Sequence, residues 1–252
     1  MRPLLESIYE RRFATNGIGR FRGVFSSFAE ANRSAPRNKP LGFNCAEYGR
    51  EFRDRLNRVY SFDYPMLFWL NCLLRNDITI FDFGGHAGTH FYAYSKYLAY
   101  PSGLKWIVCD LPEITRAGED LAREQQKKGI SFTNRFEDCN GADILIAAGS
   151  LQYIESPSFS EQLATLSDKP RHLLLNKLPL YNGETFVTLQ NGGPSYHPQY
   201  VFNRGQFIQS IRLVGYELVD QWSVETHPGK IPFHPEKSFY CHSGLCFRLV
   251  HK

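Results

Sequence analysis

Residues 79–90 read Thr-Ile-Phe-Asp-Phe-Gly-Gly-His-Ala-Gly-Thr-His, and this stretch decides the fold. Its apolar beginning predicts a short strand that ends near Asp82, and its glycine-rich part predicts a tight turn that leads into a helix. Gly84 and Gly88 carry no side chain, so the backbone can turn sharply there and approach a ligand closely. An α/β fold builds a nucleotide pocket from a strand, a turn and a helix in this order.

The spacing of the glycines separates this turn from the common dinucleotide-binding fingerprint. Dinucleotide binders use Gly-x-Gly-x-x-Gly, whereas this chain has Asp-x-Gly-x-x-x-Gly from Asp82 to Gly88. That spacing favours a different adenosine-containing cofactor, S-adenosylmethionine (SAM).

Composition and charge describe an ordinary globular protein. The chain has 252 residues, of which 42% are hydrophobic and 21% charged, and this is enough for one sizeable α/β domain with additions. The net charge of +4 is small, and basic residues are interspersed with acidic ones along the sequence. We therefore expect no nucleic-acid partner.

The sequence shows no pattern typical of a targeting segment, a membrane span or a metal site. The first residues form no apolar signal segment, and no run approaches the roughly 18 apolar residues that a membrane span needs. The six cysteines are scattered without any Cys-x-x-Cys pair, so we expect no bound metal. These observations predict a cytoplasmic location.

Strands and helices alternate from residue 78 onward, whereas residues 1–60 lack this rhythm. We predict a helical extension or cap over residues 1–60 and a cofactor-binding domain over residues 61–252. The alternation predicts a Rossmann-like, doubly wound and mostly parallel seven-stranded sheet. The predicted strands cover residues 78–83, 104–109, 130–133, 143–148, 172–176 and 216–223, with the last strand or hairpin at 238–240 and 245–250, and the predicted helices cover residues 90–98, 114–128, 158–166 and 206–213.

Polar residues and glycines follow the predicted strands at their carboxyl ends, where open α/β sheets bind ligands. Asp110 follows the second strand, and a carboxylate there can accept hydrogen bonds from two ribose hydroxyls. Asn134 follows the third strand and can meet an adenine edge. Gly149 and Ser150 follow the fourth strand. Together with the glycine turn, these residues favour a SAM site.

Four segments resemble the class I SAM-dependent methyltransferases. Residues 81–88 (FDFGGHAG) look like their first motif, and residues 108–112 (VCDLP) resemble the segment after the second strand in many small-molecule O-methyltransferases. Residues 142–154 resemble their fourth-strand motif, and residues 202–218 resemble their late helix and strand. The same runs are similar to a bacterial family of methyltransferases that is often linked to surface-polysaccharide or secondary-metabolite pathways.

The resemblance implies a cofactor site and one departure within it. The superfamily usually has glycine where this chain has His86, so the His86 side chain would crowd or contact the methionine end of SAM, or face the substrate. We expect SAM as cofactor and S-adenosylhomocysteine (SAH) as product. The expected cofactor-binding residues are Asp82, Gly84, Gly85, His86, Gly88, Asp110, Leu111, Asn134, Gly149 and Ser150.

Methylation of oxygen needs a base near the accepting hydroxyl. We name His197 and His86 as candidate catalytic residues. His197 falls in residues 191–200, which we predict to be a loop that covers the substrate after the fifth strand. The expected substrate-binding residues are Gln152, Tyr153, Asn176, Gln190, Asn191 and Tyr200.

These observations predict a SAM-dependent methyltransferase that acts on a small molecule or sugar, with oxygen as the expected accepting atom. The alternative is a degenerate protein of the same fold that binds a nucleotide or partner without methylating, and His86 keeps that alternative open. An NAD-linked oxidoreductase is disfavoured because Gly-x-Gly-x-x-Gly is absent and no Tyr-x-x-x-Lys pair follows the fourth predicted strand. The acceptor and the oligomeric state stay open, with a homodimer among the options.

Overall fold

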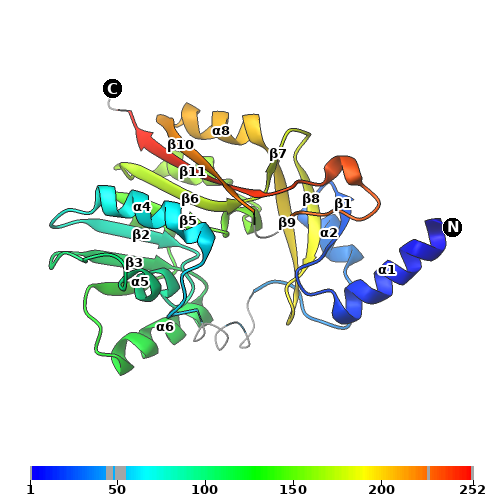
Figure 1. Cartoon of the computed structure of the whole chain (residues 1–252), viewed down its shortest axis with the longest axis horizontal. Helices are drawn as coiled ribbons and strands as arrows, with labels where there is room; N and C mark the ends of the chain where they lie inside the picture. Colours follow the sequence, from blue (N-terminus) through cyan, green and yellow to red (C-terminus); the bar gives the residue numbers. More distant parts are fainter. Residues whose placement is uncertain (1, 44–47, 49–54, 226–227, 251–252) are drawn as a thin grey trace.

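The computed structural model describes residues 2–43, 48, 55–225 and 228–250, and its main body is a seven-stranded sheet (Figure 1). The strands lie in the order β10-β11-β6-β5-β2-β3-β4, and the five from β6 to β4 are parallel. Their bounds are β2 (Thr79–Phe83), β3 (Lys105–Cys109), β4 (Ile130–Thr133), β5 (Ile144–Ala148), β6 (His172–Leu178), β10 (Tyr216–Val224) and β11 (His242–Leu249).

The predicted α/β class and the mostly parallel seven-stranded sheet are confirmed. Strand β11 runs antiparallel between β6 and β10, so only this side of the sheet departs from the parallel pattern. Strand β5 is buried along its whole length because helices cover both faces of the sheet, and this burial explains its uninterrupted apolar sequence.

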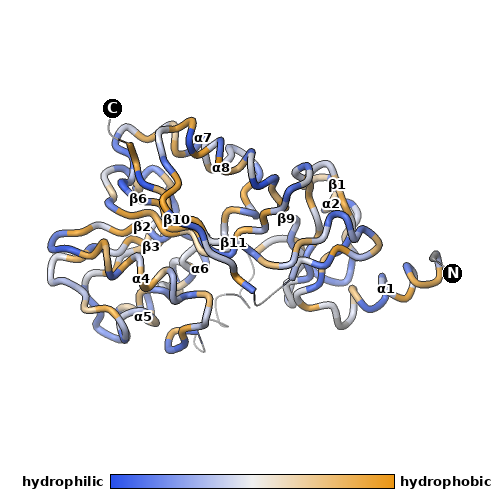
Figure 2. Tube along the Cα trace, turned by 45° about the horizontal axis from the view of Figure 1, so that its top comes forward, coloured by the Kyte–Doolittle hydropathy of each residue, from blue (hydrophilic) through white to orange (hydrophobic). Residues whose placement is uncertain are grey.

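Two apolar cores form on the two faces of this sheet. Successive strand residues point to opposite faces, so Ile80 enters one core while Phe81 enters the other. Figure 2 shows hydrophobic stretches running along strands such as β2. The helices of this part are α4 (Tyr64–Leu73), α5 (Thr89–Tyr94), α6 (Pro112–Glu124), α7 (Phe159–Thr165) and α8 (Arg204–Leu213), and the 3₁₀ turns are η1 (Ser61–Asp63), η2 (Phe136–Cys139), η3 (Leu151–Tyr153) and η4 (Pro235–Lys237).

A second, four-stranded sheet stands beside the first, and it corrects the prediction that the N-terminal extension is only helical. Its order is β1-β8-β9-β7, so the N-terminal strand β1 pairs with a strand from the second half of the chain (Figure 1). The bounds are β1 (Phe21–Phe25), β7 (Leu180–Tyr181), β8 (Phe186–Asn191) and β9 (Tyr196–Asn203), with helices α1 (Arg2–Asn16) and α2 (Phe28–Ser34).

The predicted substrate loop at residues 191–200 was wrong, because β8 and β9 form an antiparallel hairpin there. Asn191 pairs with Tyr196, and the glycines between them make a short turn in which Gly193 has a φ of +98°. The buried side chains of Leu189 and Val201 hold the two strands in the second sheet. Burial of these residues outweighs the loop-forming tendency of the Gly-Gly-Pro sequence between the strands.

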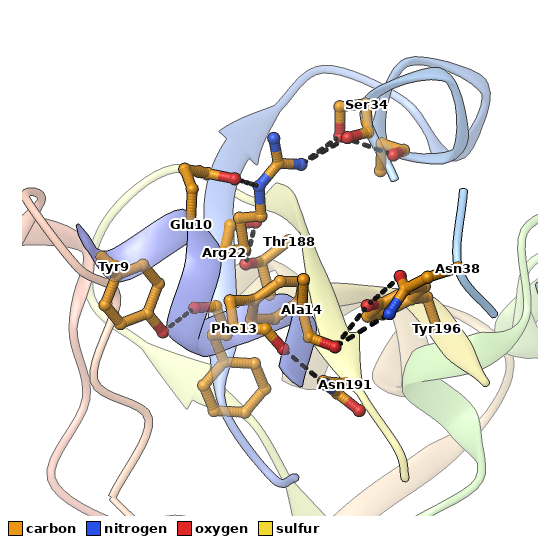
Figure 3. Close-up of polar contacts among 12 residues, drawn as sticks. Tyr9, Glu10, Phe13, Ala14, Arg22, Ser34, Asn38, Thr188, Asn191 and Tyr196 are labelled. Atoms are coloured by element: carbon orange, nitrogen blue, oxygen red, sulfur yellow. Dashed lines mark hydrogen bonds and ion pairs between the residues drawn. The ribbon is translucent and has the colours of Figure 1, made fainter. Parts of the chain in front are cut away.

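Helix α1 is attached to this sheet by polar and aromatic contacts (Figure 3). The Tyr9 hydroxyl donates to the Phe21 carbonyl at 2.6 Å, and the Phe13 ring stacks on Tyr196 with 5.4 Å between centroids. The Asn191 side chain donates to the Phe13 carbonyl at 2.6 Å. The N-terminal residues are therefore an integral part of the second sheet.

Candidate functional site

The loop after β2 has the backbone conformation that its glycines predict. Gly84, His86 and Gly88 all have positive φ, at +73°, +58° and +84°. A side chain on Gly85 would place its Cβ 2.5 Å from the Asp82 carboxyl carbon, so this position requires glycine because of a close approach. The loop therefore folds tightly over the end of β2.

Asp82 lies beneath this loop and supports it. Its side chain is fully buried, and it accepts hydrogen bonds from His90 Nδ1 at 3.0 Å and from Trp106 Nε1 at 3.2 Å. It does not line the cleft described below. The structure thus places this expected cofactor ligand under the site, where it holds the loop and α5 together.

Asp110 lies directly against the loop at the carboxyl end of β3. One carboxylate oxygen accepts the His86 N–H and the other accepts the Leu111 N–H, both at 2.8 Å. Burial raises the pKa of Asp110 to about 6. Asn134 donates to the Asp110 backbone carbonyl at 2.7 Å. Each carboxylate oxygen keeps a lone pair for a further donor such as a ribose hydroxyl.

The end of β5 closes the other side of the loop. The Ser150 hydroxyl donates to the Phe83 carbonyl at 2.7 Å, and a Cβ on Gly84 would clash with the Ser150 side chain. Gly149 donates its N–H to the Asn176 carbonyl at 2.9 Å. The structure therefore brings the predicted loop, β3-end and β5-end residues together at one edge of the sheet.

A cleft of about 720 Å³ lies between this edge and the four-stranded sheet. Three of the expected substrate residues line it, namely Gln152, Tyr153 and Gln190. The Tyr153 hydroxyl donates to Gln190 Oε1 at 2.7 Å, which links η3 of the main body to β8 of the second sheet. The cleft can therefore present amide and hydroxyl groups to a polar molecule.

The other expected substrate residues lie away from the cleft. Asn176 donates to the Phe62 carbonyl at 2.9 Å and accepts from Trp222 Nε1 at 3.1 Å, so it ties three segments together. Asn191 is buried against α1 (Figure 3), and the Tyr200 ring packs 4.8 Å from that of Phe28. These side chains stabilise the walls around the cleft.

A smaller cavity of about 210 Å³ brings His86 and His197 to one place. His197 is 1% exposed, its ring stacks on Phe43 at 3.6 Å, and its Nε2 lies 2.7 Å from the Tyr48 hydroxyl and 3.1 Å from the Ser195 hydroxyl. Burial lowers the pKa of His197 to about 4, and burial together with nearby Arg55 lowers that of His86 to about 4. Both imidazoles are therefore neutral at pH 7.

The buried imidazole of His197 should make the fold sensitive to acid. Its pKa in the folded protein, about 4, lies below the unfolded value of 6.5, so its contribution to stability is complete above pH 6.5 and is lost as the pH falls toward 4. We expect this residue to remove about 2 kcal/mol of unfolding free energy between pH 7 and pH 5. When urea unfolding is measured at both pH values, the unfolding free energy of His197→Phe should therefore fall by about 2 kcal/mol less than that of the wild-type protein. Ser195→Ala keeps the imidazole and should retain the wild-type loss, and an unchanged loss in His197→Phe would contradict the assignment.

His86 takes the left-handed conformation that a glycine would adopt in its place. Its backbone N–H still donates to Asp110, so replacing the side chain leaves that contact intact. We expect His86→Gly to retain SAH binding within about threefold. His86→Ala keeps a Cβ at positive φ and should unfold with about 1 kcal/mol less free energy than His86→Gly. Urea unfolding and calorimetric titration measure both quantities, and equal stability of the two variants would argue against backbone strain.

Several cleft residues were not assigned to the site from sequence. Lys177, Arg55, Arg58, Asp63 and His90 all line the cleft. Lys177 directly follows Asn176 at the end of the fifth predicted strand, so its position was a usable signal. The arginines precede the α/β region, and only the tertiary structure brings them to the cleft.

Within the described part of the chain, no group of three or more His, Cys, Asp or Glu side chains is arranged to hold a metal ion. None of the described helices is long and apolar enough to cross a membrane.

Comparisons with known proteins identify the fold. No family model matches the sequence, and no curated protein matches it. A SAM-dependent methyltransferase from Aquifex aeolicus is similar in structure, with a TM-score of 0.52 and 16% identity over 83% of this chain and 100% of its own. The 1,6-didemethyltoxoflavin-N1-methyltransferase of Burkholderia thailandensis, solved with 1,6-didemethyltoxoflavin and SAH, gives 0.51 and 14% over 76% and 79%.

A third similar structure is that of a protein named for a different reaction. The [4+2]-cyclase SpnF matches with a TM-score of 0.50 and 13% identity, over 75% of this chain and 81% of its own. At these identities the comparisons establish the fold alone. The chain has the fold of the class I SAM-dependent methyltransferases.

Proposed function

We propose that this chain, which has the class I SAM-dependent methyltransferase fold, binds SAM and transfers its methyl group to oxygen of a small molecule or sugar. One observation carries the proposal. The Asp110 carboxylate lies at the carboxyl end of β3 and accepts the His86 N–H from the glycine loop at 2.8 Å. An acid and a glycine turn held together at this edge, beside a large cleft, suit the ribose and the remainder of an adenosine cofactor.

The residues present fit SAM. Asp110 keeps acceptor capacity for ribose hydroxyls. Gly84 and Gly88 let the loop pack closely against Ser150 and Ile130, which holds it next to this carboxylate. SAM supplies a methyl group on a positively charged sulfur, which an electron-rich acceptor atom can take. The further residues that we expect around the cofactor are Gly85, Leu111, Asn134, Gly149 and Ser150.

The acceptor would occupy the cleft beside this edge. Gln152, Tyr153 and Gln190 supply polar contacts that can orient it. A hydroxyl acceptor must lose its proton as its oxygen bonds to the methyl carbon. His86 and His197 are neutral at pH 7 and line the smaller cavity, which shares Arg55 and Gln190 with the cleft, so a hydroxyl that reaches past Gln190 would meet these imidazoles. The resemblance of residues 108–112 to small-molecule O-methyltransferases supports oxygen as the accepting atom. The sequence resemblance to families linked to polysaccharides supports a sugar.

A second candidate function is binding, or a different reaction, on the same fold. The match to the cyclase SpnF favours keeping this candidate, because that protein shares the fold and is named for another reaction. The side chain of His86 at the glycine position of the loop also supports it. Under this alternative the chain would bind SAM or SAH without forming a methylated product.

Two measurements separate these functions. Titration calorimetry with SAM, SAH and NAD should show binding of SAM and SAH and none of NAD. Incubation with SAM and a panel of hydroxylated sugars and phenols should then release SAH, which mass spectrometry detects with the methylated product. Binding without SAH release across the panel would favour the second function, and no binding of SAM or SAH would overturn both.

A further inference from the structure

The charged side chains of the large cleft are mostly cationic. Lys177, Arg55 and Arg58 line it, and Asp63 is the one carboxylate among the described lining residues. The Asp63 carboxylate is already engaged, because it accepts the Tyr94 hydroxyl at 3.0 Å and the Tyr60 N–H at 2.9 Å. The cleft therefore has an excess of positive charge.

Lys177 is held in place by several contacts. Its backbone has a φ of +55°, a strained conformation for a lysine, and its N–H donates to Asn176 Oδ1 at 3.0 Å. Its side chain runs over Gly149, where an added Cβ would lie 3.3 Å from the lysine Cε. Its ammonium nitrogen lies 5.2 Å from the centre of the Phe62 ring. The contacts with Gly149 and Phe62 fix the position of the Lys177 side chain, which lines the cleft.

The described residues offer this ammonium group no ion pair. The same holds for the guanidinium groups of Arg55 and Arg58, since no carboxylate of the described chain lies within 4.0 Å of either. Burial lowers the pKa of Lys177, and the negative charge of nearby Asp63 opposes this effect only in part. A partly buried cation without a directly bound carboxylate costs free energy, and a bound anion would lower that cost.

Gln152 adds a neutral contact to this region. Its side chain is 4% exposed and lines the same cleft. Its Oε1 accepts no hydrogen bond from any described residue, so a hydroxyl of a bound molecule can donate to it. The cleft thus combines a cationic subsite with an acceptor for a hydroxyl.

We propose that the methyl acceptor is a hydroxylated anion, a small molecule with a carboxylate or phosphate that Lys177 binds and a hydroxyl that reaches Gln152. Arg55 and Arg58 line the same cleft and add to its positive charge. This inference rests on the proposed function, since it names the substrate class of that site. It makes Lys177 the residue that selects anionic acceptors over neutral ones.

The carboxylate in the methionine part of SAM or SAH is an alternative anion for Lys177 to bind. 5′-Methylthioadenosine lacks that carboxylate, whereas SAH has it. If Lys177 binds the cofactor, then Lys177→Met should weaken SAH binding while leaving 5′-methylthioadenosine binding unchanged. If Lys177 binds the acceptor, both affinities should stay within about threefold of wild type.

Ligand-observed NMR on the SAH-saturated protein tests the anion site, with inorganic phosphate and acetate as probes. We expect at least one probe to bind, Lys177→Met to weaken that binding at least tenfold, and Lys177→Arg to retain most of it. Lys105→Met is the matched control, because Lys105 is an exposed lysine at the amino end of β3, opposite the cleft. Circular dichroism confirms that each variant is folded.

The possible results separate the two proposals. Equal anion binding by wild type and Lys177→Met, or no anion binding by either, would overturn the inference. Loss of SAH affinity with retained 5′-methylthioadenosine affinity in Lys177→Met would also overturn it. A wild-type protein that fails to bind SAH but shows anion binding dependent on Lys177 would contradict the methyltransferase proposal and leave the anion site standing.

Discussion

Asp110→Ala should weaken SAH binding about 100-fold. Hydrogen bonds to a charged carboxylate contribute roughly 1.5–3 kcal/mol each, and loss of two to ribose hydroxyls removes at least about 3 kcal/mol, while each 1.4 kcal/mol is about tenfold in affinity. The substitution also removes the acceptor of the His86 N–H, so the glycine loop loses support on one side. Calorimetric titration measures the change. SAH affinity within threefold of wild type would remove Asp110 from the cofactor site.

The same carboxylate predicts a pH dependence of binding. Its pKa is raised to about 6, so the charged form is lost as the pH falls through that value. If the ribose hydroxyls bind the charged form, SAH affinity should be constant above about pH 7 and about tenfold weaker at pH 5. Asp110→Asn cannot titrate and should bind weakly at both values. A wild-type affinity that does not change over this range would contradict the assignment.

Asp82→Ala should destabilise the fold by about 3 kcal/mol, because it leaves two buried donors without an acceptor, each costing about 1–3 kcal/mol. His90 and Trp106 donate to this carboxylate, and the side chain is fully buried under the loop. For a chain of this size the unfolding midpoint should fall by about 6–12 °C. Thermal unfolding followed by circular dichroism measures the shift.

Trp106→Phe is the control for this effect. It removes the indole N–H and part of a fully buried ring system but keeps an aromatic ring in the core, so it should cost about 2 kcal/mol, less than Asp82→Ala. Below its unfolding midpoint, Asp82→Ala should bind SAH more tightly than Asp110→Ala does. The reverse order would place Asp82, and not Asp110, in contact with the cofactor.

The strands of the main sheet could be predicted because their signal is local. An apolar run such as β5 is typical of a strand covered on both faces, and the glycines after β2 predict the tight turn that the structure has there. Asp110, Ser150 and the loop were grouped correctly, because the carboxyl ends of parallel strands meet at one edge.

The errors fall where pairing partners are distant in sequence. Strand β1 pairs with β8 across more than 160 residues, so nothing near residue 21 indicates a sheet. Residues 191–200 contain Gly-Gly-Pro, which favours a loop, while burial against β1 and α1 makes a hairpin of the region. Asn191 was assigned to the substrate for its polarity, but the structure uses it to bind the Phe13 carbonyl (Figure 3).

By itself the sequence determined the α/β class, the glycine loop from residue 84 to 88 and the acid at Asp110, because hydrophobic period and glycine spacing are properties of short segments. Only the tertiary structure decided that Asp82 lies beneath the loop, that His86 and His197 share a cavity, and that Lys177 faces the cleft with the arginines. Those arrangements depend on contacts between segments far apart in the chain, and such contacts are set by the packing of the whole fold.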